Sequence, residues 1–394
     1  GEHGVGVEKR PYMAHMYSGA ELAAMRDIKE VFDPANLLNP GKVLPDRLPA
    51  VARREPEMPG SDPWQPKDAA EAAAGLLACT VARRRVLIGG VSVPPDSEPA
   101  IRLETARLTG VQSFAPEDLF VTVGAGMAVD DVQDFLAERG FQAPVISPWP
   151  GSTVGGILSG NIHAPSRMRY GSLRDAMLCA TVAMADGRII RAGRPLVKNV
   201  AGYDLPKVFV GARGTLGLLT DVTLKLTPVP RCRRTLVAPV GDLRSGLALA
   251  RAARSLSLLG AGIALVQEME VPGMAGSPYA QLYTIEGVDE DVAEEAAAVA
   301  GALRRAGAPI VLESDLAATA AWQAFLAGSS DPETNTLLVR MGLPVKELAT
   351  TLPHLPELAR QHGRYFVDYG AGLVYFLDHP PSPADARLRL NALR

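Results

Sequence analysis

The residues with the clearest capacity for chemistry lie in an uncharged loop, Pro150–Asn161. This loop combines four glycines with three small hydroxyl side chains. Glycines let backbone N–H groups converge on an anion, and hydroxyls add donors without bulk. Its apolar members, Val154, Ile157 and Leu158, indicate that the loop is packed inward and is not a plain surface loop. The pattern slightly favours a binding loop for a long cofactor that contains a pyrophosphate.

A second glycine motif, Gly124-Ala-Gly126, follows a predicted strand and precedes a predicted helix. That context is typical of dinucleotide-binding folds, but the third glycine of the fingerprint would fall at Val129. No acidic residue ends a second strand about 20 residues further on. We therefore interpret the motif as a tight turn and expect no NAD(P). The sequence has no GxxxxGK[ST] motif, which argues against P-loop nucleotide chemistry.

Two further segments also indicate a cofactor site. They are Val197-Lys-Asn-Val-Ala-Gly-Tyr-Asp-Leu205 and Gly211-Ala-Arg-Gly-Thr-Leu-Gly-Leu-Leu-Thr220. With Pro150–Asn161 and Arg169-Tyr-Gly-Ser172, they resemble the p-cresol-methylhydroxylase-type FAD-binding domain of flavin-linked 2-hydroxyacid oxidases. The resemblance runs from about Pro63 to Pro230, with the motifs in family order. It is most similar to the small flavin-binding subunit of bacterial glycolate oxidase.

This resemblance implies an α+β fold, in which a two-subdomain FAD-binding domain is followed by an antiparallel α+β cap domain. It also implies that the cofactor is FAD. The implied cofactor-binding residues are Gly89, Gly90, Pro150, Gly151, Ser152, Thr153, Gly155, Gly156, Ser159, Asn161, Arg169, Tyr170, Gly171, Gly214 and Leu219. Arg167 and Arg169 are also candidates for binding phosphate or a partner's acidic groups. His163 follows the loop, and we expect it to be structural.

The first residues resemble a region of a different protein from the same superfamily. Gly1-Glu-His-Gly-Val-Gly6 and Phe32–Lys42 are similar to the extreme C-terminus of the larger glycolate oxidase subunit and of D-lactate dehydrogenases. The resemblance implies that His3 is a catalytic base and that Glu2 is a ligand of a divalent metal. Because a metal site normally needs three protein ligands, we expect that metal only with a partner chain. In this polypeptide alone, we interpret the segment more simply as a docking tail without catalytic activity.

The chain divides into four predicted parts. Residues 1–46 form the tail, and 47–62 form a linker inside a proline-rich stretch with prolines at 45, 49, 56, 59, 63 and 66. Residues 63–230 form the FAD-binding domain. Residues 231–394 form the cap domain, which we interpret as truncated. Its predicted strands and helices, with a helix at 288–306 and a final hairpin at 364–369 and 372–377, indicate an antiparallel sheet. Its Tyr365, Tyr369 and Tyr375 share one parity on the terminal hairpin, a pattern that indicates packing more often than contact with a substrate.

The tail contains a predicted helix, Gly19–Phe32, whose apolar side chains recur at helical spacing: Leu22, Met25, Ile28 and Phe32. So short a segment cannot enclose its own core and must pack on another surface. The chain's own body and a large-subunit partner are both candidates. Because GEHGVG matches the large subunit's pattern, we favour docking in trans.

Composition excludes several classes of protein. The chain has 394 residues, 47% apolar and 21% charged, with a net charge of −3, so it is globular and unlike a nucleic-acid binder. Three widely spaced cysteines indicate reduced thiols and a cytoplasmic setting, at most peripheral to a membrane through partners. The longest uncharged stretch, Gly140–Ser166, contains four prolines, so no transmembrane span is expected.

Two functions fit the sequence. In the first, the chain binds FAD in a complex with a large flavin subunit and an iron–sulfur subunit, and helps oxidise glycolate or D-lactate, a small 2-hydroxy acid. In the second, it is a non-catalytic structural subunit with a vestigial flavin site. The intact loops favour the first. The second is favoured by Ile88-Gly-Gly-Val-Ser-Val-Pro-Pro95, where paired prolines stand in place of the family's usual serine-threonine-glycine continuation.

Overall fold

The computed structural model describes residues 5–6, 8–52, 54–89, 100–195, 202–269, 276–329, 336–354 and 363–393. The chain folds into two compact units. The first unit comprises Gly1–Ile146, Gly151–Ile162 and Leu173–Thr227, and the second comprises Ser147–Pro150, His163–Ser172 and Pro228–Arg394. Each unit is described by itself below.

The first unit is built on a five-stranded antiparallel sheet in the order β3-β4-β8-β6-β7. Its strands are β3 (Val111–Ala115), β4 (Phe120–Gly124), β6 (Met177–Ala183), β7 (Ile189–Gly193) and β8 (Leu218–Lys225). Two smaller pairs accompany it, the parallel β1 (Arg85–Ile88) and β2 (Ala100–Leu103), and β5 (Phe141–Gln142) with β9 (Thr227–Pro228). The helices are η1 (Arg10–Tyr12), α1 (Met13–Met16), α2 (Gly19–Phe32), α3 (Ala69–Val81), α4 (Val129–Ala137), α5 (Val154–Gly160), α7 (Leu173–Ala176) and α8 (Pro206–Phe209).

Helix α3 packs against β6 and β7 and begins at Asp68, whose carboxylate accepts the Glu71 N–H at 2.8 Å. An aspartate at this position satisfies one of the N–H groups that the first helical turn leaves unpaired. The side chain of Trp64 packs under α3, where a Cβ at Gly75 would lie 2.3 Å from the indole. The proline-rich stretch runs along the same helix, since Glu57 N donates to Ala74 O at 3.3 Å.

The tail packs on its own chain. Helix α2 begins in a capping box, in which Ser18 and Glu21 each bond the other's backbone N–H. It contacts β7, and Leu22 and Met25 are fully buried in the core of the first unit. The expectation of docking in trans is therefore wrong for these residues. Phe32, predicted on the apolar face, is 82% exposed, so that face ends before the last turn of the helix.

The second unit is built on a seven-stranded antiparallel sheet in the order β13-β10-β12-β11-β15-β16-β14. Its strands are β10 (Cys232–Val240), β11 (Gly260–Gln267), β12 (Tyr279–Gly287), β13 (Leu312–Ser314), β14 (Leu337–Gly342), β15 (Gly363–Asp368) and β16 (Leu373–Asp378). The helices are α6 (Arg167–Tyr170), α9 (Leu243–Leu256), α10 (Asp289–Arg305), α11 (Ala318–Ala327), η2 (Val345–Glu347), α12 (Leu348–Thr351), η3 (Leu352–His354) and α14 (Pro383–Leu393). The antiparallel α+β architecture predicted for this region is confirmed.

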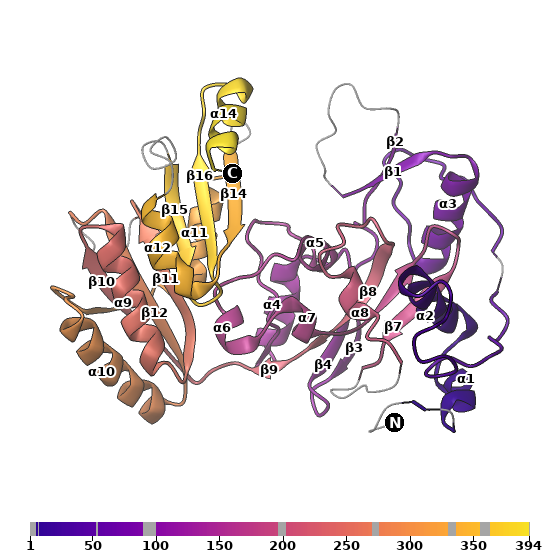
Figure 1. Ribbon diagram of the computed structural model, residues 1–394, viewed down its shortest axis with the longest axis horizontal. Helices are drawn as coiled ribbons and strands as arrows, with labels where there is room; N and C mark the ends of the chain where they lie inside the picture. Colours follow the sequence, from indigo (N-terminus) through magenta and orange to yellow (C-terminus); the bar gives the residue numbers. More distant parts are fainter. Residues whose placement is uncertain are drawn as a thin grey trace. The chain divides into compact units, whose positions relative to one another are not determined.

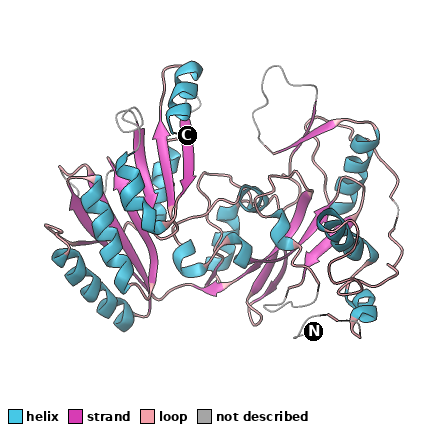
Figure 2. Cartoon of the chain, in the orientation of Figure 1, coloured by secondary structure: helices cyan, strands magenta, loops and turns pink. Residues whose placement is uncertain are grey.

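Helices cover both faces of this sheet (Figures 1 and 2). Helices α9 and α10 lie together on one face, where alternate strand residues such as Leu265 and Tyr283 enter the core. Helix α11 contacts β11 and β12, and its Phe325 packs on Phe366, which lies on the opposite face. The three tyrosines of the terminal hairpin lie on two different faces of the sheet, because Tyr375 pairs with Phe366 and not with a residue of the parity of Tyr365. Tyr365 and Tyr369 pack with α9 and α10, whereas Tyr375 faces Trp322 of α11.

None of the described helices in either unit is both long and apolar enough to cross a membrane.

Candidate functional site

The predicted binding loop and the Gly124–Gly126 turn are hydrogen-bonded to each other in the first unit. Gly155 N donates to Ala125 O at 2.7 Å, and Val154 N donates to Met127 O at 3.0 Å. In return, Val129 N donates to Ser152 O at 2.9 Å. The Thr153 hydroxyl accepts the Gly156 N–H at 3.1 Å and starts α5. The two glycine-rich segments therefore form one rigid surface.

The glycines of the Gly124–Gly126 turn are required by its own packing. A Cβ at Gly124 would lie 2.2 Å from Leu108 O, and a Cβ at Gly126 would lie 1.8 Å from Thr105 O. Those oxygens belong to backbone that cannot move aside as a flexible side chain can. The geometry agrees with the interpretation of this motif as a tight structural turn.

The loop before β8 closes on the other end of α5. Gly211 N donates to Leu158 O, and Arg213 N donates to Ser159 O, each at 3.0 Å. Asn161 ends α5 in the left-handed conformation. Gly214, with a φ of +73°, approaches the end of β1, since its Cβ would lie 3.1 Å from the Ile88 side chain. The structure thus brings the loop at 151–161, Gly214 and the end of β1 into one region of the first unit.

Three of the predicted positions offer space for a ligand. Gly89 and Gly151 have positive φ values of +81° and +74°, and a Cβ at either would meet no atom of the described residues within 4 Å. Gly156 is exposed at the start of α5. Backbone that is open and free of Cβ atoms is what a pyrophosphate requires for close approach, so these residues fit an FAD cradle. By contrast, the side chain of Leu219 is 4% exposed and belongs to the core, so only its backbone is available.

Four predicted contacts lie in the second unit. Pro150 is exposed there, and Gly171 ends α6 with a positive φ of +84°. The side chains of the other two are engaged within the unit. Arg169 Nη1 donates to Leu259 O at 3.1 Å, and the Tyr170 hydroxyl donates to the Glu286 carboxylate. Their cofactor role therefore stays a prediction based on the resemblance. His163 is buried in this unit, and its carbonyl accepts the Tyr375 hydroxyl at 3.2 Å.

The proposed chemistry of the tail lies outside the described residues, because Glu2 and His3 fall in an undescribed segment. Gly90 and residues 197–201 of the segment Val197–Leu205 are likewise outside the described residues. Among the residues that are described, no three His, Cys, Asp or Glu side chains come together as a metal site.

Lys207 is a half-buried cation that the motif analysis missed. Its ammonium donates to Met177 O at 2.6 Å and ties the segment after residue 202 to β6. Burial lowers its pKa, and the negative charges of Asp204 and Asp175 partly oppose that shift. The sequence around Lys207 gives no sign of this hydrogen bond, because the acceptor, Met177 O, lies on a strand 30 residues earlier.

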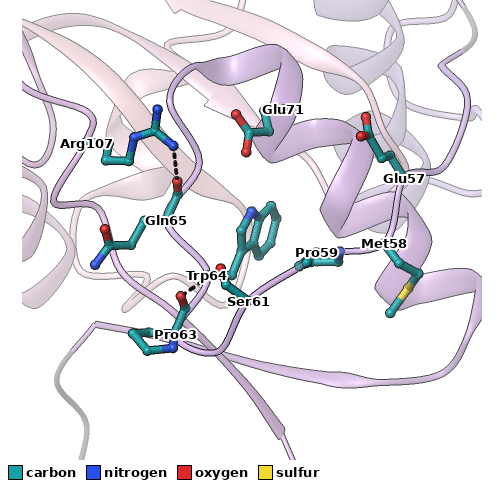
Figure 3. A pocket seen from close by; sticks show the side chains of 10 residues that line it. Glu57, Met58, Pro59, Ser61, Pro63, Trp64, Gln65, Glu71 and Arg107 are labelled. Carbon is teal, nitrogen blue, oxygen red and sulfur yellow. Dashed lines mark hydrogen bonds between the residues drawn. The ribbon is translucent and has the colours of Figure 1, made fainter.

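A pocket of about 240 Å³ lies beside Trp64 in the first unit, where the proline-rich stretch meets α3. Figure 3 shows Gln65 and Arg107 on one side of the indole and Glu57 and Met58 on the other. Arg107 reaches Gln65 O at 3.5 Å, and Ser61 donates to Pro63 O at 3.1 Å. None of the predicted cofactor-binding residues lines this pocket. The sequence analysis predicted only a linker for the part of its lining that lies at 57–61.

Comparisons with known families agree with this geometry. Residues 64–193 match the FAD binding domain family model, and residues 1–43 match the model for the C-terminal domain of FAD linked oxidases. Along the chain, the segment that matches the C-terminal domain of FAD linked oxidases thus precedes the segment that matches the FAD binding domain.

The curated relatives to which parts of the chain are similar include glycolate oxidase subunits and D-lactate dehydrogenases. Part of the chain is 40% identical to glycolate oxidase subunit GlcD of Bacillus subtilis over 123 residues, which is 31% of this chain and 26% of that protein. It is 33% identical to glycolate oxidase subunit GlcE of Escherichia coli over 129 residues, 32% of this chain and 37% of that protein. A D-lactate dehydrogenase of Archaeoglobus fulgidus is 31% identical over 163 residues, 41% of this chain and 35% of that protein. The matches thus span between about a quarter and two fifths of each relative.

Solved structures confirm the fold. The chain superposes on p-cresol methylhydroxylase with a TM-score of 0.68 at 12% identity, covering 84% of this chain and 77% of that one. For alkyldihydroxyacetonephosphate synthase the TM-score is 0.67 at 12% identity, with 84% and 69% covered. The p-cresol-methylhydroxylase-type fold predicted from the sequence is therefore confirmed.

Proposed function

We propose that this chain is the FAD-binding subunit of a glycolate oxidase-type 2-hydroxyacid dehydrogenase. One observation carries the proposal. The glycine-rich loop at 151–156, Gly214 and Gly89 are held in one region of the first unit, and Gly89 and Gly151 have open space around them. That region belongs to the part of the chain that matches an FAD binding domain.

In this proposal the backbone of the 151–156 loop, with the hydroxyls of Ser152 and Thr153, holds the pyrophosphate of FAD. Gly89 and Gly90 form the other side of the cradle. Ser159, Asn161, Gly214 and the backbone of Leu219 lie toward the remainder of the cofactor. Bound FAD supplies a hydride acceptor for oxidation of the substrate hydroxyl carbon. The contacts of Pro150, Arg169, Tyr170 and Gly171 with FAD rest on the family resemblance alone.

We further propose that glycolate or D-lactate is the substrate, and that turnover requires a large flavin subunit, with an iron–sulfur subunit to receive electrons. A neutral imidazole at His3 can take the hydroxyl proton of the substrate, and Glu2 can contribute to a metal site only if a partner supplies further ligands. The proposal rests on the relatives' names and on the tail's match to the oxidase C-terminal domain.

Activity measurements test this proposal. The purified chain alone should show negligible reduction of an artificial acceptor with glycolate or D-lactate, and addition of a large subunit should restore turnover. Robust turnover by the isolated chain that is lost in His3→Ala would contradict the need for a partner. No turnover in any reconstituted complex would leave the 2-hydroxyacid assignment without support.

The second candidate function is a structural subunit with a vestigial flavin site. The observation that favours it is the pair Pro94-Pro95 in place of the family's usual phosphate-loop continuation. The flavin content of the purified chain separates the two functions, because a structural subunit would be colourless while its assembly with partners stayed intact.

A further inference from the structure

We propose that the second unit contains a binding pocket for a small organic phosphate monoester. Its lining shares Arg169 and Tyr170 with the contacts that the family resemblance assigns to FAD, and its other residues are not among the predicted flavin contacts. The pocket has a volume of about 470 Å³ and opens to solvent. It is lined by Met168, Arg169, Tyr170, Arg254, Ser257, Leu258 and Gly260.

Three elements form the pocket: helix α6, the end of α9 and the start of β11. Helix α6 packs directly against β11. Their approach is close, because a Cβ at Gly260 would lie 2.9 Å from the Met168 methyl group and 2.3 Å from the Ser257 hydroxyl. Glycine at position 260 thus lets Met168 and Ser257 pack closely on the start of β11, where a larger side chain would displace them.

Two guanidinium groups provide its charge. Arg254 lies in the last turn of α9 and is exposed, and its guanidinium makes no hydrogen bond or ion pair with any residue in the described ranges. Arg169 is half-buried and uses Nη1 to bond Leu259 O, which fixes the side chain at the pocket wall. The planar fork of an arginine has five N–H donors, so most of its donors stay available for a ligand.

The acidic groups nearby are already used by other donors. Glu286 accepts Arg233 Nε at 2.6 Å on one oxygen and the Tyr170 hydroxyl on the other. Glu295 accepts the N–H groups of Leu258 and Leu259 at 3.1 and 2.8 Å and the Tyr283 hydroxyl at 2.5 Å. These two carboxylates therefore hold the pocket's walls in place and form no ion pair with Arg169 or Arg254 within the described part of the chain, although Arg254 also acts electrostatically on the buried Asp368.

The chemistry of the lining defines the ligand class. Two positive charges match a doubly charged head group, and arginine forks bond phosphate oxygens in pairs. Met168, Leu258 and the ring of Tyr170 add apolar surface for a short organic part. A phosphate monoester combines a compact dianion with such a part, and the volume is in the range of small-molecule pockets.

Calorimetric titration of the full chain with phenyl phosphate and with inorganic phosphate, at constant ionic strength, tests the proposal. We expect both to bind, phenyl phosphate more tightly. Arg254→Gln should weaken both by about tenfold or more, because hydrogen bonds to a charged group are lost. The matched control is Arg251→Gln, which removes the same charge from an exposed site on α9 that does not line the pocket, and it should change binding by less than about twofold.

Two results of the phosphate titrations would overturn the proposal. One is the absence of phosphate binding to the wild-type chain. The other is an equal loss in Arg251→Gln and Arg254→Gln, which would indicate a general surface potential and no defined pocket. Acetate that binds as tightly as inorganic phosphate would likewise contradict recognition of a dianion. Flavin content and the thermal midpoint of both variants should equal those of the wild-type chain, so that a failure here is distinct from a failure of the flavin assignment.

Discussion

The two units of this chain prepare their surfaces for ligands in different ways. In the first unit the candidate site consists of backbone, with glycines at 89, 151 and 156 left open beside a rigid loop. In the second unit the candidate pocket consists of side chains, with Arg169 and Arg254 standing beside carboxylates that already have partners. The first arrangement suits a long cofactor that needs close approach, and the second suits a compact anion.

The cores of the two units differ as well. The core of the first unit joins segments far apart in sequence, because Leu22 and Met25 of the tail pack with strands from residues 121–226. The core of the second unit is assembled mainly from consecutive strands and helices after residue 231. Loss of one tail contact should therefore damage the flavin-binding unit, although the tail contains no predicted cofactor contact among its described residues.

The largest effect is expected from Leu22→Ala. Leu22 is fully buried in the core of the first unit, so its truncation should lower the free energy of unfolding by about 2–5 kcal/mol. The matched control on the same helix is Phe32→Ala, whose side chain is 82% exposed and whose loss should cost less than about 0.5 kcal/mol. Chemical denaturation measures both. Equal effects would show that the tail does not pack on its own chain.

The next effect concerns a buried carboxyl group in the second unit. Burial raises the pKa of Asp368 from 3.8 to about 7, and its Oδ2 has no hydrogen-bond partner among the described residues. Between these pH values the folded state holds a proton that the unfolded state has lost, so stability falls as the pH rises from about 4 to about 7. Asp368→Asn removes this dependence and should stabilise the chain at pH 8 by on the order of 2–4 kcal/mol.

Thermal and chemical denaturation at several pH values check this prediction. At pH 4 the wild-type chain and Asp368→Asn should have nearly the same free energy of unfolding, because both carry an uncharged group at that position. A variant that is less stable than the wild type at pH 8 would show that the carboxylate is charged and bound by a partner.

A smaller effect is expected at the turn beside the cofactor loop. Gly126→Ala places a methyl group 1.8 Å from Thr105 O, so the backbone must shift, at a cost of about 1–3 kcal/mol. Gly60→Ala is the control, since its Cβ would meet nothing within 4 Å. If Gly126→Ala is as stable as Gly60→Ala but loses flavin, then Gly126 contacts the cofactor and is more than a structural turn.

The smallest effect is expected at a helix start in the second unit. Asp242 caps α9 by accepting the Ser245 N–H at 2.8 Å, and hydrogen bonds from Ser245 lower the pKa of Asp242. Asp242→Ala should cost about 1 kcal/mol at pH 7. Because the folded-state pKa is lowered, this contribution is lost as the pH falls through that value. A cost that is the same at pH 7 and pH 2 would contradict a charged cap.

Local patterns predicted much of the fold. The terminal hairpin was predicted at 364–369 and 372–377 and is found at Gly363–Asp368 and Leu373–Asp378, because alternating apolar residues around a glycine turn leave little choice of structure. The helix predicted at 288–306 likewise spans Asp289–Arg305. The parallel strand Ala100–Leu103 was missed, since its four residues lack the alternation that marks a strand.

Choices between partners could not be predicted in the same way. Helical spacing identified an apolar face on residues 19–32 but carried no information about which surface would cover it. Similarly, the partners of Arg169 and Tyr170 lie at Leu259 and Glu286, about a hundred residues later in the sequence. Contacts over such separations depend on the assembled sheet, so a local motif could indicate an arginine's chemistry but not its neighbours.

The most direct test of the central claim is the flavin content of the purified full chain, measured by its absorption spectrum and by FAD released on denaturation. We predict about one FAD per chain in the wild type and in Gly301→Leu, and a strong loss in folded Gly156→Leu. The two glycines are matched, because each lies in a helix and an added Cβ would approach one side-chain atom of the described residues within 4 Å. That atom is Thr153 Oγ1 at 3.1 Å for Gly156 and Arg305 Nη1 at 3.3 Å for Gly301. A wild-type chain without flavin, or equal flavin in all three proteins, would contradict the assignment of the 151–156 loop as the FAD cradle.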